Sequence, residues 1–429
     1  MQSDRFQVAR RKTTGACDKT TSFGPGLPFV FLFLFRVFAV IAQNNGTPEL
    51  LISYIENAPE IVSTAAVLLD TSTGTALYAK NPDLEIPPAS LTKLMTMHLV
   101  MNEVEAGRAF LDEMVTITKE SWAQSQPPRS SLMFLAPGQI VTLREIMLGL
   151  AVSSGNDAAV AAALRFAPGV QDFAAIMTEE ARRMGLSVTR FTEPSGISED
   201  NMTTAAECAD FCRQYITLHP RALREFHSVP VFAYPKAENV PAAFRNNPNT
   251  IVQYNRNNFL KDFPGADGLK TGYIDEAGYN ISLTAERGHT RFLLVILGAP
   301  AHTGGDLIRD ADARRLLSWA FDNFKTLRPD IPAPDKVRLW KGRADDVEIK
   351  LAASPDFTSP VNRGNYLHYN IQTERLIAPV HMGQHTGWLI ISDDIGEIHR
   401  IELVSVQNYD KGNIFKRIFH TLVLFFKNL

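Results

Sequence analysis

The chain of 429 residues has a globular composition, with 45% hydrophobic and 21% charged residues and a formal net charge of −3. Its length leaves room for two domains, and its weakly acidic balance argues against a nucleic-acid partner. Cys208 and Cys212 lie four residues apart without a nearby histidine or second cysteine pair, so we expect two buried free thiols, no metal and no cofactor.

The N-terminal segment has the pattern of a secretory signal peptide. Basic residues precede an apolar run over 27–42, which ends in small residues. Arg36 interrupts this run, and a membrane span normally needs about 20 apolar residues with few charges, so a retained anchor is the weaker alternative. We expect residues 1–42 to be removed and the mature protein to be secreted to the periplasm.

The next region begins with a β-hairpin and continues into helices. Two apolar runs, 65–70 and 76–79, flank a glycine-containing turn and predict the hairpin. A helix is expected from about Ser90 to Glu105. Thr142 and Glu145 form a capping box, which marks the start of another helix. That helix should extend over 142–153, and two further helices are expected, one from about 157 and one over 171–184.

A second hairpin and a helix follow the helical region. The hairpin covers 279–298, and the helix runs over 306–324. A hairpin, a helical insert, a second hairpin and a helix together imply an antiparallel sheet covered by helices. The fold class is therefore α+β, with this first domain expected over 43–328.

The remainder of the chain predicts a small second domain. Residues 329–334 contain three prolines and have the composition of a linker at a domain boundary. Short runs of alternating apolar and polar residues over 337–406 predict strands. We expect an all-β sandwich over 329–411.

Ser90 and Lys93 are the first candidates for chemistry. Residues three apart share a helix face, so Lys93 can reach the Ser90 hydroxyl. A serine hydroxyl becomes a good nucleophile only when a base lies within hydrogen-bond reach, and lysine can act as that base if its pKa falls. The alternative is a chance Ser-x-x-Lys tetrapeptide on a solvated helix.

Two further tripeptides could contribute to the same site. Ser154 and Asn156 lie at the turn between two predicted helices, where they could face a cleft or simply cap a helix. Lys270, Thr271 and Gly272 precede the second hairpin and should lie on or beside a strand. The lysine and the hydroxyl could hold a substrate carboxylate, and the glycine would let a peptide approach the backbone.

The three motifs are weak singly, but their order and context are informative. Ser-x-x-Lys, Ser-x-Asn and Lys-Thr-Gly together mark serine penicillin-binding proteins and β-lactamases. The chain resembles low-molecular-weight penicillin-binding proteins of the D-alanyl-D-alanine carboxypeptidase family from about residue 65 to the end. The most specific pieces are 88–96 and 267–273, with further matches at 254–257, 277–280 and 316–319.

This resemblance implies an enzyme that removes the terminal D-alanine from peptidoglycan pentapeptides and is covalently inhibited by β-lactams. Ser90 would attack the carbonyl between the two terminal D-alanines, and Lys93 would accept its proton. Ser154 would pass a proton to the departing D-alanine, while Asn156 would orient the peptide and Lys93.

The same resemblance assigns roles to the strand motif. Lys270 and Thr271 would bind the terminal carboxylate, beside Gly272. Lys270 would also help to keep Lys93 neutral by like-charge repulsion. The backbone N–H groups of Ser90 and Tyr273 would form the oxyanion hole.

Several features are less certain to follow the family. Arg256 and Arg309 match family arginines near the site, although either could form an ordinary surface ion pair. Ile274 stands where many relatives carry a threonine. The segment 193–201 corresponds to a loop bordering the active site but matches loosely, so it leaves substrate preference and the rate of acyl-enzyme hydrolysis open.

Three rival functions use the same motif residues. A β-lactamase-like hydrolase is disfavoured because the second motif is Ser-Gly-Asn rather than Ser-Asp-Asn, and because no glutamate-containing deacylation loop is evident. An endopeptidase would cut cross-links with the same residues. A catalytically idle wall-binding scaffold has no support from the sequence, which retains every motif residue.

The C-terminal segment 412–429 predicts a basic amphipathic helix. At 100° per residue, one side collects large apolar side chains, and Val423 and Leu424 fall among the basic residues opposite. Such a helix lies in a membrane interface, and the family ends in a comparable anchor, so we expect a peripheral position on the outer face of the inner membrane. The alternative is a helix docked on the β-domain. The apolar side holds Ile414, Phe415, Ile418, Phe419, Leu422, Phe425, Phe426 and Leu429.

Overall fold

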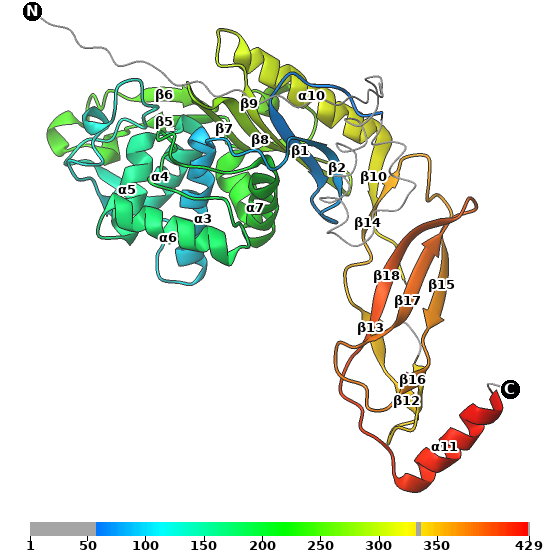
Figure 1. Ribbon diagram of the computed structural model, residues 1–429. Coiled ribbons are helices and arrows are strands. Elements are labelled where there is room, and N and C mark those ends of the chain that lie inside the picture. The colour runs from blue at the N-terminus through cyan, green and yellow to red at the C-terminus, as the bar shows by residue number, and fades with distance from the viewer. Residues whose placement is uncertain (1–56, 332–335, 428–429) are drawn as a thin grey trace, which may run out of the picture.

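The computed structural model describes residues 57–331 and 336–427. A body of helices and sheet lies at one end of the molecule, and a slender β-domain projects from it, with helix α11 at the far tip (Figure 1). The predicted signal segment, 1–42, lies outside the described residues, as do residues 332–335 of the predicted linker region.

The body is built on a five-stranded antiparallel sheet, which confirms the predicted fold class. The first hairpin pairs with the second along β1 and β9, where Ala65 lies opposite Leu297 and Asp70 opposite Phe292. In sheet order the strands are β2 (Ala76–Lys80), β1 (Ala65–Asp70), β9 (Thr290–Ala299), β8 (Gly278–Arg287) and β7 (Ala266–Ile274).

Helices cover both faces of this sheet (Figure 1). Because successive side chains of a strand point to opposite faces, β1 and β9 supply two separate cores. Leu68 and Leu294 pack on one face with α10 (Gly305–Asn323). Val67 and Leu293 belong to the other core, which includes residues of α3 (Lys93–Glu105) and α7 (Ala205–Leu218).

The helical insert completes the wall of the body. The predicted capping box starts α4, since Thr142 Oγ1 accepts from the Glu145 N–H (3.2 Å) and the Glu145 carboxylate accepts from the Thr142 N–H (2.9 Å). Short strand pairs and turns that the sequence did not reveal brace this insert. Its elements are β3 (Met114–Thr116), β4 (Ile140–Thr142), α4 (Leu143–Leu148), η3 (Gly149–Ser153), α5 (Asn156–Phe166), α6 (Val170–Arg183), α8 (Pro220–Ala222), η4 (Leu223–His227), β5 (Val231–Tyr234), β6 (Ile251–Tyr254) and α9 (Phe259–Asp262).

In the described part of the projecting domain the regular elements before the last helix are all strands, as the alternating pattern predicts. Its apolar core is separate from those of the body and includes Leu339, Leu389 and Leu403. The strands are β11 (Val337–Trp340), β12 (Asp346–Val347), β13 (Ile349–Leu351), β15 (His368–Thr373), β16 (Leu376–Ile377), β17 (His385–Ser392) and β18 (Glu397–Ser405).

The junction between the two parts is held by a strand pair and a buried carboxylate. β10 (Phe324–Leu327), which precedes the predicted boundary at 328/329, pairs antiparallel with β14 (Phe357–Pro360), which follows it. Asp70, at the end of β1, accepts hydrogen bonds from the hydroxyls of Thr326 (2.7 Å) and Thr358 (2.8 Å). Burial raises the pKa of this Asp70 carboxyl.

Helix α11 (Ile414–Lys427) docks on the β-domain with the face that the sequence marks as polar. His420 is buried, its Nδ1 accepts from the backbone N–H of Lys341 (2.7 Å), and its ring packs edge-on against Trp340. Leu424, a misfit in the helical projection, is also buried. The predicted apolar face therefore points away from the domain.

Candidate active site

Ser90 lies in a tight helical turn, η1 (Ala89–Thr92), that leads directly into α3. Ala89 has a φ of 50°, a left-handed conformation that costs free energy for a residue with a β-carbon and is typical of functional sites. Lys93, the first residue of α3, donates from Nζ to the Ser90 hydroxyl at 3.0 Å. The structure thus brings the predicted nucleophile and base together.

Lys93 Nζ makes three hydrogen bonds and is shielded from solvent. Its Nζ also donates to Asn156 Oδ1 (2.8 Å) and to the backbone carbonyl of Ser195 (2.5 Å), and the side chain is fully buried. Burial, with a smaller contribution from the nearby Arg256 guanidinium, lowers the pKa of Lys93 to about 7, against the opposing carboxylates of Glu193 and Asp157.

The family resemblance implied that Lys270 helps to lower the pKa of Lys93; in the structure burial is the largest cause, and the cation that contributes is Arg256. Repulsion between the two lysines instead contributes to the low pKa of Lys270, which burial lowers well below its usual range. A lysine with a pKa near 7 is substantially unprotonated at neutral pH, so it can accept a proton from Ser90.

The second motif lies where a helix changes its winding. A π-helical turn, η3, ends at Ser153. Ser154 follows it with a φ of 58°, a left-handed conformation that separates η3 from α5, which begins at Asn156. Asn156 bridges two segments, because its Oδ1 accepts from Lys93 and its Nδ2 donates to the Ser130 hydroxyl (3.1 Å). π-Turns are rare and frequently mark functional sites.

The third motif lies on the edge strand β7, directly beside the serine. A β-carbon on Gly272 would stand 2.9 Å from the Ser90 nitrogen and 3.1 Å from Pro88 O, so glycine is what permits this approach. Lys270 is buried, and its Nζ donates to the Thr271 carbonyl (2.9 Å). The strand therefore brings a backbone edge and a buried cation to the nucleophile.

An open cavity of about 300 Å³ lies over Ser90. Lys93 and Asn156 lie behind its wall and contact Ser90 or one another. Arg256 has no carboxylate partner among the described residues, whereas Arg309 pairs with Asp310 at 2.6 Å while still facing the cavity. The lining residues are Ser90, Arg129, Ser131, Ser154, Arg256, Asn258, Thr271, Gly272, Tyr273, Tyr279, Asp306 and Arg309.

Arg129 is a cavity residue that the sequence analysis did not select. Its φ is 66°, and it carries no ion pair with the residues that the structure describes. The neighbouring Ser130 and Ser131 are fixed by Asn156, which donates to the Ser130 hydroxyl and, from its backbone, to Ser131 O (2.8 Å). The cavity thus has more guanidinium than carboxylate groups on its wall.

The loosely matching loop 193–201 contacts the nucleophile turn directly. The Glu193 carboxylate accepts from the backbone N–H groups of Ser195 (2.7 Å) and Ile197 (3.0 Å), which folds the loop around it. A β-carbon on Gly196 would lie 1.8 Å from Ala89 O, so the loop and the turn touch backbone to backbone. Lys93 therefore depends on a loop carbonyl that has no side-chain signature in the sequence.

A serine in contact with a buried lysine of lowered pKa, next to a Lys-Thr-Gly edge strand of an antiparallel sheet, is the arrangement of the penicillin-recognising class of serine hydrolases. The family model described as D-alanyl-D-alanine carboxypeptidase matches residues 53–301. The chain belongs to this family of serine-type peptidases, which act on peptidoglycan.

Individual relatives extend the match beyond the catalytic domain. D-alanyl-D-alanine carboxypeptidase DacD of Escherichia coli is 32% identical over 398 residues, which is 90% of this chain and 95% of that protein. Penicillin-binding protein 5 of Haemophilus influenzae superposes with a TM-score of 0.72 at 28% identity, covering 83% and 99% of the two chains. Penicillin-binding protein D2 of Listeria monocytogenes in its cefotaxime-bound form gives 0.52 at 27% identity, covering 61% and 98%.

Proposed function

We propose that the protein cleaves the terminal D-alanine from peptidoglycan pentapeptides through an acyl-enzyme on Ser90. The observation that carries this proposal is the 3.0 Å contact between Lys93 Nζ and Ser90 Oγ, made by a lysine whose pKa is about 7. Lys93 accepts the hydroxyl proton as Ser90 Oγ bonds to the carbonyl carbon between the two D-alanines. Ser154, on the cavity wall, passes a proton to the departing amine, and water then hydrolyses the ester.

The charges on the cavity wall favour an anionic chain end. Thr271 and the arginines 129, 256 and 309 bind the terminal carboxylate or a second carboxylate of the peptide, with Lys270 buried behind Thr271. The N–H groups of Ser90 and Tyr273 stabilise the oxyanion, because Gly272 lets β7 lie against the Ser90 nitrogen. A β-lactam presents a carboxylate and a strained amide to the same groups and acylates Ser90.

We further propose that the chain is divided into a signal peptide (1–42), a catalytic domain (43–328), a β-sandwich (329–411) and a membrane-binding helix (412–429). Seven large apolar side chains on the outward face of α11, from Ile414 to Phe426, are each more than half exposed. A basic helix with such a face lies in a bilayer interface. Among the described residues, no helix is long and apolar enough to cross a membrane.

The catalytic proposal is tested with wild-type protein and Ser90→Ala, each given a fluorescent penicillin and a pentapeptide ending in D-Ala-D-Ala. We expect a covalent adduct and released D-alanine from the wild type, both lost in the variant. D-Alanine release that survives Ser90→Ala would refute the mechanism. An adduct without D-alanine release would favour the scaffold, and cleavage confined to cross-linked dimers would favour the endopeptidase.

A further inference from the structure

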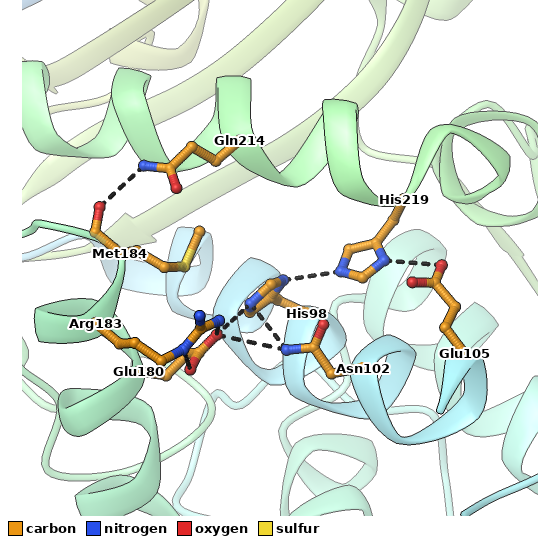
Figure 2. A network of polar contacts seen from close by, with 8 residues as sticks. All are labelled: His98, Asn102, Glu105, Glu180, Arg183, Met184, Gln214 and His219. Atoms are coloured by element: carbon orange, nitrogen blue, oxygen red, sulfur yellow. Dashed lines mark hydrogen bonds and ion pairs between the residues drawn. The ribbon is translucent and has the colours of Figure 1, made fainter. Parts of the chain in front are cut away.

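A chain of ionisable side chains joins α3, α6 and the end of α7 (Figure 2), and none of its residues lines the cavity. His98, on the same helix as Lys93, contacts His219 through Nδ1 (2.9 Å to Nε2) and Glu180 through Nε2 (2.8 Å to Oε1). His219 Nδ1 in turn lies 2.9 Å from Glu105 Oε1. The two rings are at most 1% exposed, and the chain ties α3 to α6 and to the end of α7.

These three contacts require more protons than two neutral rings possess. Each hydrogen bond needs one hydrogen, an ionised carboxylate supplies none, and a neutral imidazole supplies one. The Arg183 guanidinium lowers the pKa of Glu180 to about 2, so this carboxylate is ionised. Two neutral histidines therefore satisfy two contacts, and the third contact needs one additional proton on either ring.

Loss of that proton has a defined structural consequence. With two protons left, His219 Nδ1–H still donates to Glu105 and His98 Nδ1–H donates to His219, which leaves His98 Nε2 bare. Asn102 Nδ2 lies 3.1 Å from this nitrogen and can donate to it. The contact between His98 and Glu180 then joins two lone pairs and is lost, which weakens the polar link between α3 and α6 and leaves Asn102 Nδ2, 3.5 Å from Glu180 Oε1, as the remaining polar contact between His98's helix and Glu180.

Charged and titratable groups on α6, α7 and α8 surround His98 and His219. From α6, Glu180 and Arg183 face His98; from α7, the Tyr215 ring packs edge-on against both imidazoles. Burial raises the pKa of Tyr215 well above its usual range, so this phenol stays neutral. From α8, Arg221 acts on Glu105. Burial lowers the pKa of His98, which favours its Nε2 as the atom that loses the proton.

We propose that His98 and His219 are positioning residues which share one extra proton and, while they hold it, fix the helix bearing Lys93 against α6. The pair makes the active site sensitive to pH through a contact that no substrate touches. The structural part stands on the contacts alone, whereas the link to acylation rests on the proposed function of Ser90 and Lys93.

The proton itself can be observed in the full-length protein labelled with 15N-histidine. We expect His98 Nε2 to be protonated at pH 5.5 and unprotonated at pH 9, with His219 Nδ1 protonated at both. Signals are assigned from the spectrum of His219→Gln. A His98 Nε2 that stays protonated, or stays bare, over this range overturns the proposal.

Glu180→Gln tests the same idea without loss of a histidine. A glutamine can donate to the bare Nε2, so all contacts are made with two protons. The matched control is Glu179→Gln, which removes an exposed ion pair with Arg182 (3.2 Å) from the same helix. Loss of the ion pair between Glu180 and Arg183 lowers stability about equally across this pH range, so only the slope reports the extra proton.

Because burial lowers the pKa of His98 in the folded protein, the unfolded chain binds more protons than the native chain at acid pH, so stability in the control should rise with pH up to about 6.5. In Glu180→Gln the native network holds no extra proton, so at acid pH this rise should be steeper by up to about tenfold in the unfolding constant per pH unit. Slopes that are equal in the two variants overturn the proposal.

Below about pH 6.5, where the folded His98 ring takes up the extra proton, the pH dependence of acylation by fluorescent penicillin should differ between the two variants, because only in Glu179→Gln does the contact between His98 and residue 180 depend on that proton. Identical pH profiles in the two variants would show that the network does not position Lys93. If the wild type forms no adduct, the proposed function is refuted. The NMR measurement then still tests whether the two histidines share an extra proton.

Discussion

Helices α3 and α11 each reverse the usual rule for burial, in opposite directions. At the start of α3, Lys93 is 0% exposed, although isolated charges are costly to bury. On α11, Phe415 is 81% exposed, although phenylalanine usually lies in a core. The comparison teaches that function is best sought where side chains occupy the environment that they least favour: the buried amine is the proposed base, and the exposed ring belongs to the proposed membrane-binding face.

The largest effect is expected from the buried charge. Lys93→Met should reduce acylation of Ser90 by about 10²–10⁴-fold, because a general base contributes roughly that factor. The control is Lys119→Met, which changes an exposed lysine outside the site. The rate of adduct formation with a fluorescent penicillin measures the difference, and comparable losses in both variants would remove Lys93 from its proposed role.

The backbone contact that encloses Lys93 can be broken by one β-carbon. Gly196→Ala places a methyl group 1.8 Å from Ala89 O at a φ of 83°, and should cost about 2–4 kcal/mol from strain and overpacking. Gly185→Ala has a similar φ of 88° but open space, so about 1–2 kcal/mol is expected. Urea unfolding measures both, and equal losses would show that the approach to Ala89 does not matter.

The exposed rings of α11 should matter for location rather than for stability. Replacing Phe415 and Phe419 by serine removes about 3–6 kcal/mol of apolar burial available to a bilayer, and should move the protein from membranes to the soluble fraction. Leu424→Ser changes a residue buried on the docked face and should leave the distribution unchanged while weakening docking. Cell fractionation measures the distribution, with the deletion of 412–429 as reference. If the double serine variant and the deletion variant both stay on membranes, α11 is not the anchor.

The smallest effect concerns the pH at which Lys93 becomes active. Acylation should rise with pH around 7, because the neutral amine is the base. Arg256→Gln removes a cation that lowers the pKa of Lys93, so the midpoint should move upward, by less than about one unit. Arg309→Gln should leave the midpoint in place, since Arg309 acts on Lys270 rather than on Lys93. A downward shift in Arg256→Gln would contradict this assignment.

The sequence predicted the site where side chains alone define it. Ser90 and Lys93 meet because residues three apart share a helical face, and the hairpins follow from short apolar runs around glycine-containing turns. The placement of Lys270, Thr271 and Gly272 on a strand likewise follows from the segment itself. These features are local, so one segment of sequence contains the physical reason for each.

What the sequence could not reveal depends on contacts between distant segments. The carbonyl of Ser195 binds Lys93 across 102 positions, and any residue would supply that oxygen. Arg129 lines the cavity in a segment whose next two residues, both serines, are held by Asn156. The docking of α11 through its polar face depends on the Lys341 backbone N–H, which donates to His420 across 79 positions.

Gly196 and Gly272, which lie on either side of Ser90, restrict the substitutions that the active site can accept. A β-carbon at 196 would collide with Ala89 O, and one at 272 would crowd the Ser90 nitrogen, so a larger residue at either position must displace the backbone that carries the nucleophile. Substitutions that change the cavity without this cost are therefore expected at its rim, for example at the side chains of Arg129 or Tyr273.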